Sequence, residues 1–117
     1  MIKVEAIVAR DRIETVIAAI EAEVGNIGVT VFEATGHGRE SGSSYDGPGL
    51  PAKAFLTSIV PEDKAQAVAG AICDAARSGN ESGDGLVWMS SVYNVRHIRT
   101  GKALHEYVDA GYVKAGA

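Results

Sequence analysis

Apolar residues follow two different periods along the first third of the chain. Residues 2–9 alternate and then become apolar on both faces, which predicts a strand with a buried end. Over residues 13–24 the apolar side chains recur at steps of three and four, which predicts an amphipathic helix capped by Asp11 and ended by Gly25. Residues 28–35 are β-branched and aromatic, and they predict a second strand.

The same order of elements follows in the rest of the chain. Residues 36–52 hold five glycines and two prolines, which predicts a long mobile loop. Residues 53–60 predict a third strand, and Pro61 starts a second helix. A polar, glycine-rich loop then leads to a fourth strand over 86–95. The inward stripe expected of the second helix is Ala65, Val68, Ala69, Ile72, Cys73 and Ala76.

Two consecutive β-α-β units predict the fold class. Right-handed crossovers place four strands in one antiparallel sheet with both helices on one face, an α+β, ferredoxin-like βαββαβ sandwich. Residues 1–117 are predicted to form a single domain. The apolar residues of the strands cannot all face the helices, so some of them lie on the other face of the sheet. We expect part of that face to contact other subunits.

Composition excludes several classes of function. Eleven Lys and Arg stand against fifteen acids, a net charge of -4, which disfavours nucleic-acid binding. Cys73, the single cysteine, is expected to be a buried thiol, and one cysteine suits a reducing cytoplasm. No signal peptide precedes the first strand and no run of eighteen apolar residues occurs, so we expect a cytoplasmic protein without membrane insertion.

Two glycine-rich segments have the chemistry of phosphate binding. In Gly36-His37-Gly38-Arg39, backbone N–H groups can approach a ligand while Arg39 offers a fork of donors. Gly83-Asp84-Gly85, at the entry to a strand, can form a second set of amides for an anion. Each segment alone is also a common structural turn.

Taken in order, several landmarks make the chain resemble the PII signal-transduction family over residues 1 to about 102. The landmarks are Gly28-Val29-Thr30-Val31, Gly36-His37-Gly38-Arg39, Ile59-Val60-Pro61-Glu62-Asp63, Ser78-Gly79 with Gly83-Asp84-Gly85, and Ile98-Arg99-Thr100-Gly101. The resemblance implies a homotrimer that binds ATP or ADP in clefts between subunits. It also implies a regulator, not an enzyme, which acts on transporters, enzymes or transcription factors through a long T-loop.

The resemblance assigns roles to loops and residues. It implies a T-loop at about 37–52, a B-loop at about 79–86 and a C-terminal segment at about 97–117, with a short helix there. Arg99 would reach into the cleft of an adjacent subunit, and Lys53 falls where the family has a lysine associated with 2-oxoglutarate. The implied nucleotide-binding residues are Thr30, Gly36, Gly38, Arg39, Gly83, Asp84, Gly85, His97 and Arg99.

Departures from the family's motifs indicate which nucleotide the protein binds. Leu86 stands where the family has a phosphate-binding lysine, His97 replaces an arginine, and Glu40 replaces a glutamine. Since two phosphate-directed cations are lost, we favour ADP or AMP over Mg-ATP with 2-oxoglutarate, with Glu40 and Lys53 as effector candidates. The T-loop is also short, and the family's uridylylation is not expected at Tyr45. Because PII-like proteins with shortened T-loops include proteins linked to bicarbonate handling and carboxysomes, the resemblance suggests a role in inorganic-carbon metabolism. The partner would then be a transporter or a carboxysome-related protein.

Rival interpretations use the same residues differently. A small phosphatase or acyl-phosphate hydrolase would grip phosphate with Arg39 or Arg99 and use His97 as acid or base, but no nucleophile is paired with a base. A nitrogen-regulatory PII protein that responds to ATP and 2-oxoglutarate is a second alternative. A metal-linked tolerance protein of similar trimeric fold is a third, although the three histidines match no tight metal-ligand spacing.

Overall fold

Strand β1 (Ile2–Ala9) lies inside the sheet of the computed structural model, which describes residues 1–37, 49–79 and 83–104. It pairs antiparallel with β3 (Ala52–Val60) on one side and with β4 (Gly85–Ser91) on the other. Strand β2 (Thr30–Thr35) pairs antiparallel with the outer edge of β3. The resulting order, β2-β3-β1-β4, is that of a ferredoxin-like sheet and confirms the predicted α+β fold class.

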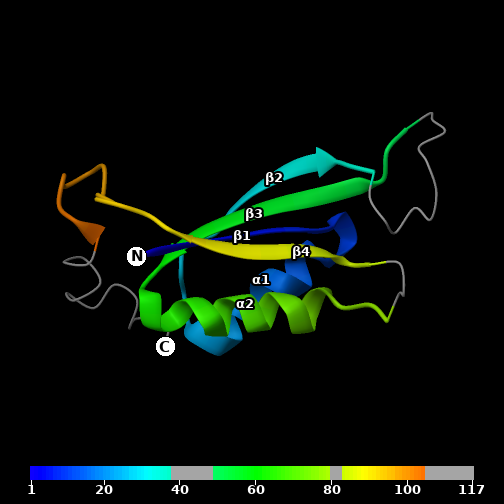
Figure 1. The fold of residues 1–117 in the computed structure, drawn as a ribbon, viewed down its shortest axis with the longest axis horizontal. Coiled ribbons are helices and arrows are strands. Elements are labelled where there is room, and N and C mark those ends of the chain that lie inside the picture. The colour runs from blue at the N-terminus through cyan, green and yellow to red at the C-terminus, as the bar shows by residue number, and fades with distance from the viewer. Residues whose placement is uncertain (38–48, 80–82, 105–117) are drawn as a thin grey trace.

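Both helices cover the same face of this sheet (Figure 1). A 3-10 turn, η1 (Arg10–Arg12), leads from β1 into α1 (Ile13–Val24), and α2 (Glu62–Ala76) follows β3. The core between helices and sheet is aliphatic, and its most completely buried large side chains are Val4, Val8, Val16, Ile20, Leu56, Val60, Val68 and Ile72. No helix in the described part of the chain is long and apolar enough to cross a bilayer.

Ser58 is the buried polar residue of this core among those described. Its side chain faces the helices from β3, is 3% exposed, and donates a 2.6 Å hydrogen bond to the carbonyl of Gly28. Gly28 belongs to the connection between α1 and β2, which forms no ladder bonds of its own. The hydroxyl therefore satisfies a carbonyl of this connection and ties it to the sheet.

Among the described residues, no helix lies on the opposite face of the sheet (Figure 1). Aromatic rings from three strands lie in a row on it, with centroid distances of 6.0 Å from Phe32 to Phe55 and 6.0 Å from Phe55 to Trp88. Phe32 is 56% exposed in the single chain. We call these three residues, with Ile7 and Leu86, the open face. The apolar surface expected here from the sequence is therefore present.

Three predicted details are wrong. Strand β4 ends at Ser91, not at 95, because Ser91 pairs with Ile2, the first residue of β1; beyond this pair, Val92 N–H still donates to the carbonyl of Met1, and no further pairing follows in the described residues. Cys73 is exposed, because the stripe that α2 buries passes through Ile72 at steps of three and four and leaves the next position outside. Asp11 lies in η1 and forms no cap bond with α1.

Candidate functional site

One end of the sheet gathers the glycine loops. The strand register places Thr35 opposite Ala52, Ala9 opposite Lys53 and Val8 opposite Gly85. The segments at 36–52 and 77–85 therefore leave the sheet at the same end, on the right in Figure 1. We call this the loop end. Gly36, Lys53 and Gly83 to Gly85 lie at this end; their predicted roles in binding stay predictions.

A carboxylate closes the loop over 78–84. Asp84 accepts hydrogen bonds from Ser78, one from its hydroxyl to Oδ1 and one of 3.1 Å from its backbone N–H to Oδ2. The pKa of Asp84 is lowered, chiefly by the hydrogen bond from the Ser78 hydroxyl and next by the bond from the Ser78 N–H. The positive charges of Arg12 and Arg77 lower this pKa further. Asp84 is thus a charged clamp of the loop. The family resemblance placed Asp84 at the ligand and named Ser78-Gly79 as a landmark, but the sequence did not predict that Ser78 binds Asp84.

Gly85 shapes the strand entry next to this clamp. Its φ is +113°, and a Cβ built on it would lie 1.9 Å from the carbonyl oxygen of Ile7. Only glycine fits where β4 approaches β1 so closely. Gly83, with φ of +122°, has open space around it instead. The backbone is therefore closely packed at Gly85 and open at Gly83; the predicted binding of an anion by this turn stays a prediction.

The base of the loop at 36–52 is closed by backbone. Gly36 N–H donates a 3.1 Å hydrogen bond to the carbonyl of Pro51, and His37 beside it is exposed. Gly38, Arg39, Glu40 and Tyr45 lie outside the described residues. Their predicted roles stay predictions.

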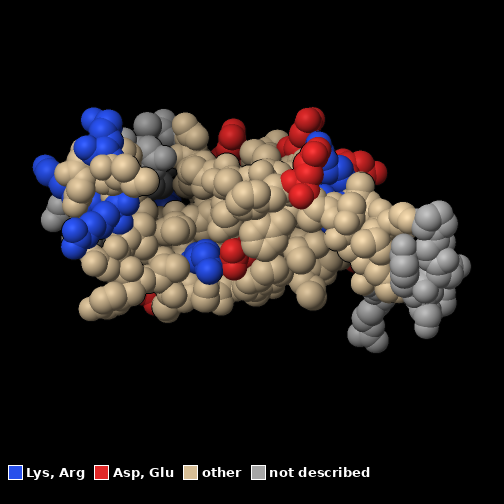
Figure 2. Space-filling view, turned by 90° about the horizontal axis from the view of Figure 1, so that it is seen from above, with Lys and Arg blue, Asp and Glu red and all other residues tan. Residues whose placement is uncertain are grey.

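His97 and Arg99 lie beyond the opposite end of the sheet. Residues 95–104 fold back in a tight turn, in which His97 N–H donates to the carbonyl of Lys102 at 2.9 Å and Gly101 N–H donates to that of His97 at 2.7 Å. Arg99 at the tip is exposed, and its neighbour Ile98 is 99% exposed. Figure 2 shows blue basic side chains gathered at this end, and the segment supplies Arg96, Arg99 and Lys102. We call residues 92–104 the arm.

The predicted nucleotide residues are therefore divided within one chain. Strand β4 alone, from Gly85 to Ser91, separates the loop end from the arm by about 20 Å. Thr30 lies between them, on the open side of the sheet opposite Thr57. A small ligand held at the loop end does not reach Arg99 of the same chain.

Leu86 completes the loop end with an apolar side chain. It stands on the open face opposite Ile7 and is 71% exposed. A cation is therefore missing from the place where the family resemblance implies one. Leu86 also borders a small cavity of about 170 Å³ between α2 and β4, which Cys73, Arg77 and Asp84 help to line.

A larger cavity of about 690 Å³ opens beside Lys53. Its described walls come from the end of β1, from η1, from the first turn of α1 and from the start of β3. They are Ala9, Arg10, Asp11, Ile13, Glu14, Pro51, Ala52 and Lys53. The sequence pointed to Lys53 but not to Arg10 or Asp11, because only the fold brings the end of β1 beside the start of β3. In the described ranges, no three His, Cys, Asp or Glu side chains are grouped to hold a metal ion.

Comparisons with known proteins agree with these landmarks. Residues 1–102 match the family described as nitrogen regulatory protein P-II. A nitrogen regulatory protein P-II of Rhizobium meliloti is 38% identical over 109 residues, which cover 87% of this chain and 95% of that protein. One from Synechocystis is 35% identical over 108 residues, with coverage of 87% and 95%. A P-II homolog of Arabidopsis thaliana is 36% identical over 86% of this chain and 54% of its own length. The chain belongs to the P-II family of signalling proteins.

Proposed function

We propose that this P-II protein is a trimeric regulator that binds an adenine nucleotide in clefts between subunits and acts on a partner through its T-loop. The observation that carries the proposal is the division of the predicted ligand residues between the loop end and the arm. Since one chain cannot bring both groups to one small ligand, a complete site requires the arm of a second copy. The open face, on which no helix of the described ranges packs, gives the second copy a surface to pack on.

The chemistry of the two halves is complementary. The loop end offers glycine backbone at 83–85 beside the Asp84 clamp, and the arm offers the exposed Arg99 and the half-buried His97. Backbone N–H groups and an arginine fork are the donors that phosphate prefers. Leu86 adds no charge at the loop end, so fewer cations face the phosphates. This favours ADP or AMP as the ligand, with ATP binding more weakly.

Mixed trimers test the shared site directly. Arg39→Ala removes the cation predicted at the loop end, and Arg99→Ala removes the cation of the arm. We expect each variant alone to lose most ADP binding in calorimetry. When the two are unfolded and refolded together, about a quarter of the clefts combine two unmodified halves and should recover native affinity.

Two outcomes decide against the proposal. If no adenine nucleotide binds the unmodified protein, the nucleotide assignment fails. If the mixture binds no better than the separate variants while mixed trimers are present, the cleft is not shared between subunits. Lys64→Gln, on the helical side of the chain, serves as the matched control for a lost cation.

We further propose that the regulated process is the handling of inorganic carbon, with a transporter or carboxysome-related protein as partner. The short T-loop expected from the sequence motivates this assignment, and Leu86, Glu40 and His97, which depart from the family's motifs, agree with a specialised member of the family. Calorimetry with ADP should then show a response to bicarbonate. The protein remains in the cytoplasm in this proposal.

A nitrogen-regulatory role is the second candidate, because the relatives from Rhizobium meliloti and Synechocystis carry that name. In that case Mg-ATP and 2-oxoglutarate should bind cooperatively and bicarbonate should have no effect. The same calorimetric experiment therefore separates the two processes. A coupled response to 2-oxoglutarate would decide for nitrogen.

A further inference from the structure

Arg12 links the start of α1 to the end of α2. It is the last residue of the η1 turn, and its Nη2 donates a hydrogen bond to the carbonyl of Ala75. The last carbonyls of a helix have no partner within the helix, and a positive charge beside them is favourable. Residues 73–76, the last turn of α2, contain no Lys or Arg. Arg12 therefore supplies from η1 the cation that the end of α2 lacks.

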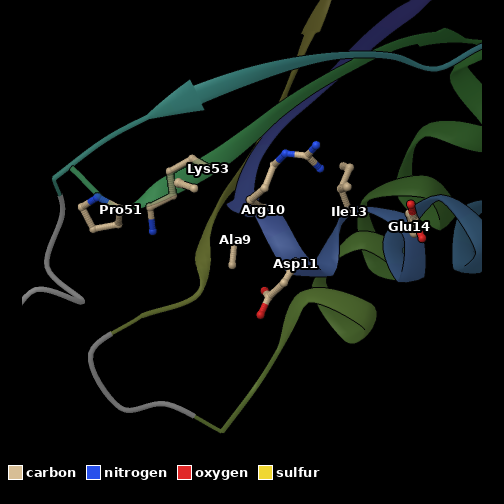
Figure 3. A pocket seen from close by; sticks show the side chains of 8 residues that line it. Ala9, Arg10, Asp11, Ile13, Glu14, Pro51 and Lys53 are labelled. Atoms are coloured by element: carbon tan, nitrogen blue, oxygen red, sulfur yellow. The ribbon is translucent and has the colours of Figure 1, made fainter. Parts of the chain in front are cut away.

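The side chain of Arg12 is half-buried, and its Nε is buried with no hydrogen-bond partner among the described residues. Burying an N–H group without a partner is unfavourable. The bond to Ala75 and the negative end of α2 therefore hold the side chain in this place. Arg10 of the same turn serves another element, because in Figure 3 it extends toward β2, where its Nε lies 3.0 Å from Oε1 of Glu33.

The end of α2 leads directly to the clamp between Ser78 and Asp84. Ser78 follows Ala75 by three residues, and its hydroxyl and its N–H both donate to Asp84. After these two bonds from Ser78, the charge of Arg12 lowers the pKa of Asp84 more than the charge of Arg77 does, although Arg77 is much nearer in the sequence. Arg12 therefore lies close enough to the clamp for its charge to act there.

These contacts close a ring of elements. Strand β1 continues into η1, Arg12 joins η1 to the end of α2, the clamp joins α2 to the start of β4, and β4 pairs with β1 at Gly85 and Val8. Figure 1 shows the end of α2 and the start of β4 on the same side of the molecule. The β1–β4 side of the ring is tightly defined, because Gly85 leaves no room for a side chain beside β1. Closure of the clamp then depends on where α2 ends, and Arg12 holds that end.

We propose that Arg12 is a positioning residue for the turn at 83–85. By fixing the end of α2 it keeps Ser78 within reach of Asp84, and the closed clamp in turn presents the backbone at Gly83 to a phosphate group. Arg12 acts through Ser78 and not by contact with the ligand. The effect on phosphate rests on the proposed nucleotide function, whereas the effect on the clamp does not.

NMR on the protein without nucleotide tests the effect on the clamp. Arg12→Met removes the charge and the donors and keeps an unbranched apolar side chain. We expect the amide hydrogen of Ser78 to exchange about tenfold faster, and the pKa of Asp84 to rise toward its ordinary value. A rise in this pKa alone reports the lost charge, whereas faster exchange reports an opened clamp. Arg10→Met, from the same turn, and Ile20→Val, a mild loss in the core, are the controls and should change neither.

A double-mutant cycle shows whether Arg12 affects the ligand through the clamp. In calorimetry with ADP, we expect Arg12→Met and Ser78→Ala each to weaken binding about tenfold. Because Ser78→Ala already opens the clamp, the double variant should bind ADP about as weakly as Ser78→Ala alone. Arg10→Met should bind ADP like the unmodified protein.

The proposal is overturned if the Ser78 amide exchanges in Arg12→Met as it does in the unmodified protein. It is also overturned if Arg12→Met binds ADP with unchanged affinity, or if the two losses of affinity add in the double variant. If no adenine nucleotide binds the unmodified protein, the proposed function fails by itself. The exchange of the Ser78 amide then still decides whether Arg12 positions the clamp.

Discussion

The indole Nε1 of Trp88 donates a 3.0 Å hydrogen bond to Oε1 of Glu5, its direct neighbour in the β1–β4 register. Lys3 Nζ lies 3.5 Å from the same oxygen. The bond holds the indole near Phe55, whose ring centroid lies 6.0 Å from that of Trp88. Aromatic rings that combine a fixed polar anchor with exposed apolar area are typical of specific protein interfaces.

This arrangement predicts that the open face is where subunits associate. Phe55→Glu should place a charge in the middle of the aromatic row and convert the expected trimer into smaller species, as measured by sedimentation velocity. Ala18→Glu, on the exposed side of α1, is the matched control and should leave the assembly unchanged. A Phe55→Glu protein that sediments like the unmodified one would refute the assignment of this face.

The fold was largely predictable because its signals are local. The recurrence of Val16, Ile20 and Val24 specified the buried side of α1, and alternation specified the side of Val4 in β1. Further along β1 the residues are apolar on both faces, so the burial of Ala6 and Val8 was not specified. The end of β4 was not predictable, because it depends on where the partner strand begins. The exposure of Cys73 was missed for a similar reason. The sequence shows which residues of a helix are apolar, but the packing of the helix on the sheet decides which of them are buried.

Gly85→Ala should destabilise the fold strongly. The added methyl would meet the carbonyl oxygen of Ile7 at 1.9 Å, and the positive φ disfavours any side chain. We expect a loss of about 2–3 kcal/mol or more in the free energy of unfolding. Gly70→Ala is the control, because nothing lies within 4 Å of its Cβ position in the middle of α2. It should gain about 0.5–1 kcal/mol.

Urea unfolding at one protein concentration compares the two glycine variants, since association contributes to apparent stability. A loss in both would point to a general sensitivity to glycine replacement. A neutral Gly85→Ala would contradict the close approach of β4 to β1.

The clamp between Ser78 and Asp84 predicts a response to acid. Because the hydroxyl and N–H of Ser78 favour the charged carboxylate, the pKa of Asp84 is lower in the folded protein than in the unfolded chain. Its contribution to stability is therefore complete above the ordinary aspartate value of about 3.9 and is lost as the pH falls through the lowered pKa. At neutral pH the clamp is closed.

Ser78→Ala tests the clamp without removing the carboxylate. It should raise the pKa of Asp84 toward the ordinary value, as followed by the side-chain carbon signal in an NMR titration. Thr100→Ala, a matched loss of a hydroxyl in the arm, should leave that pKa unchanged. An Asp84 pKa that does not move in Ser78→Ala would show that another group holds the carboxylate charged.

The candidate site was predictable only in part. The glycines at 83–85 stood out, since few residues other than glycine allow such turns. The cavity beside Lys53 was not predictable, because Asp11 and Lys53 are far apart in sequence and neither forms a motif. Likewise, no sequence pattern predicts that Ser78 donates hydrogen bonds to Asp84 or that Arg10 forms an ion pair with Glu33. Such pairs are products of tertiary packing.

Ser58→Ala should cost about 1–2 kcal/mol of stability, because it leaves the carbonyl of Gly28 without its donor beneath the sheet. The change also loosens the connection into β2, the strand that carries Thr30 and Phe32. Ser90→Ala, at an exposed position of β4, is the matched control and should change the free energy of unfolding by less than about 0.5 kcal/mol. Thermal and urea unfolding at equal protein concentration measure both. Equal stability of the two variants would mean that the buried hydroxyl does not stabilise this connection.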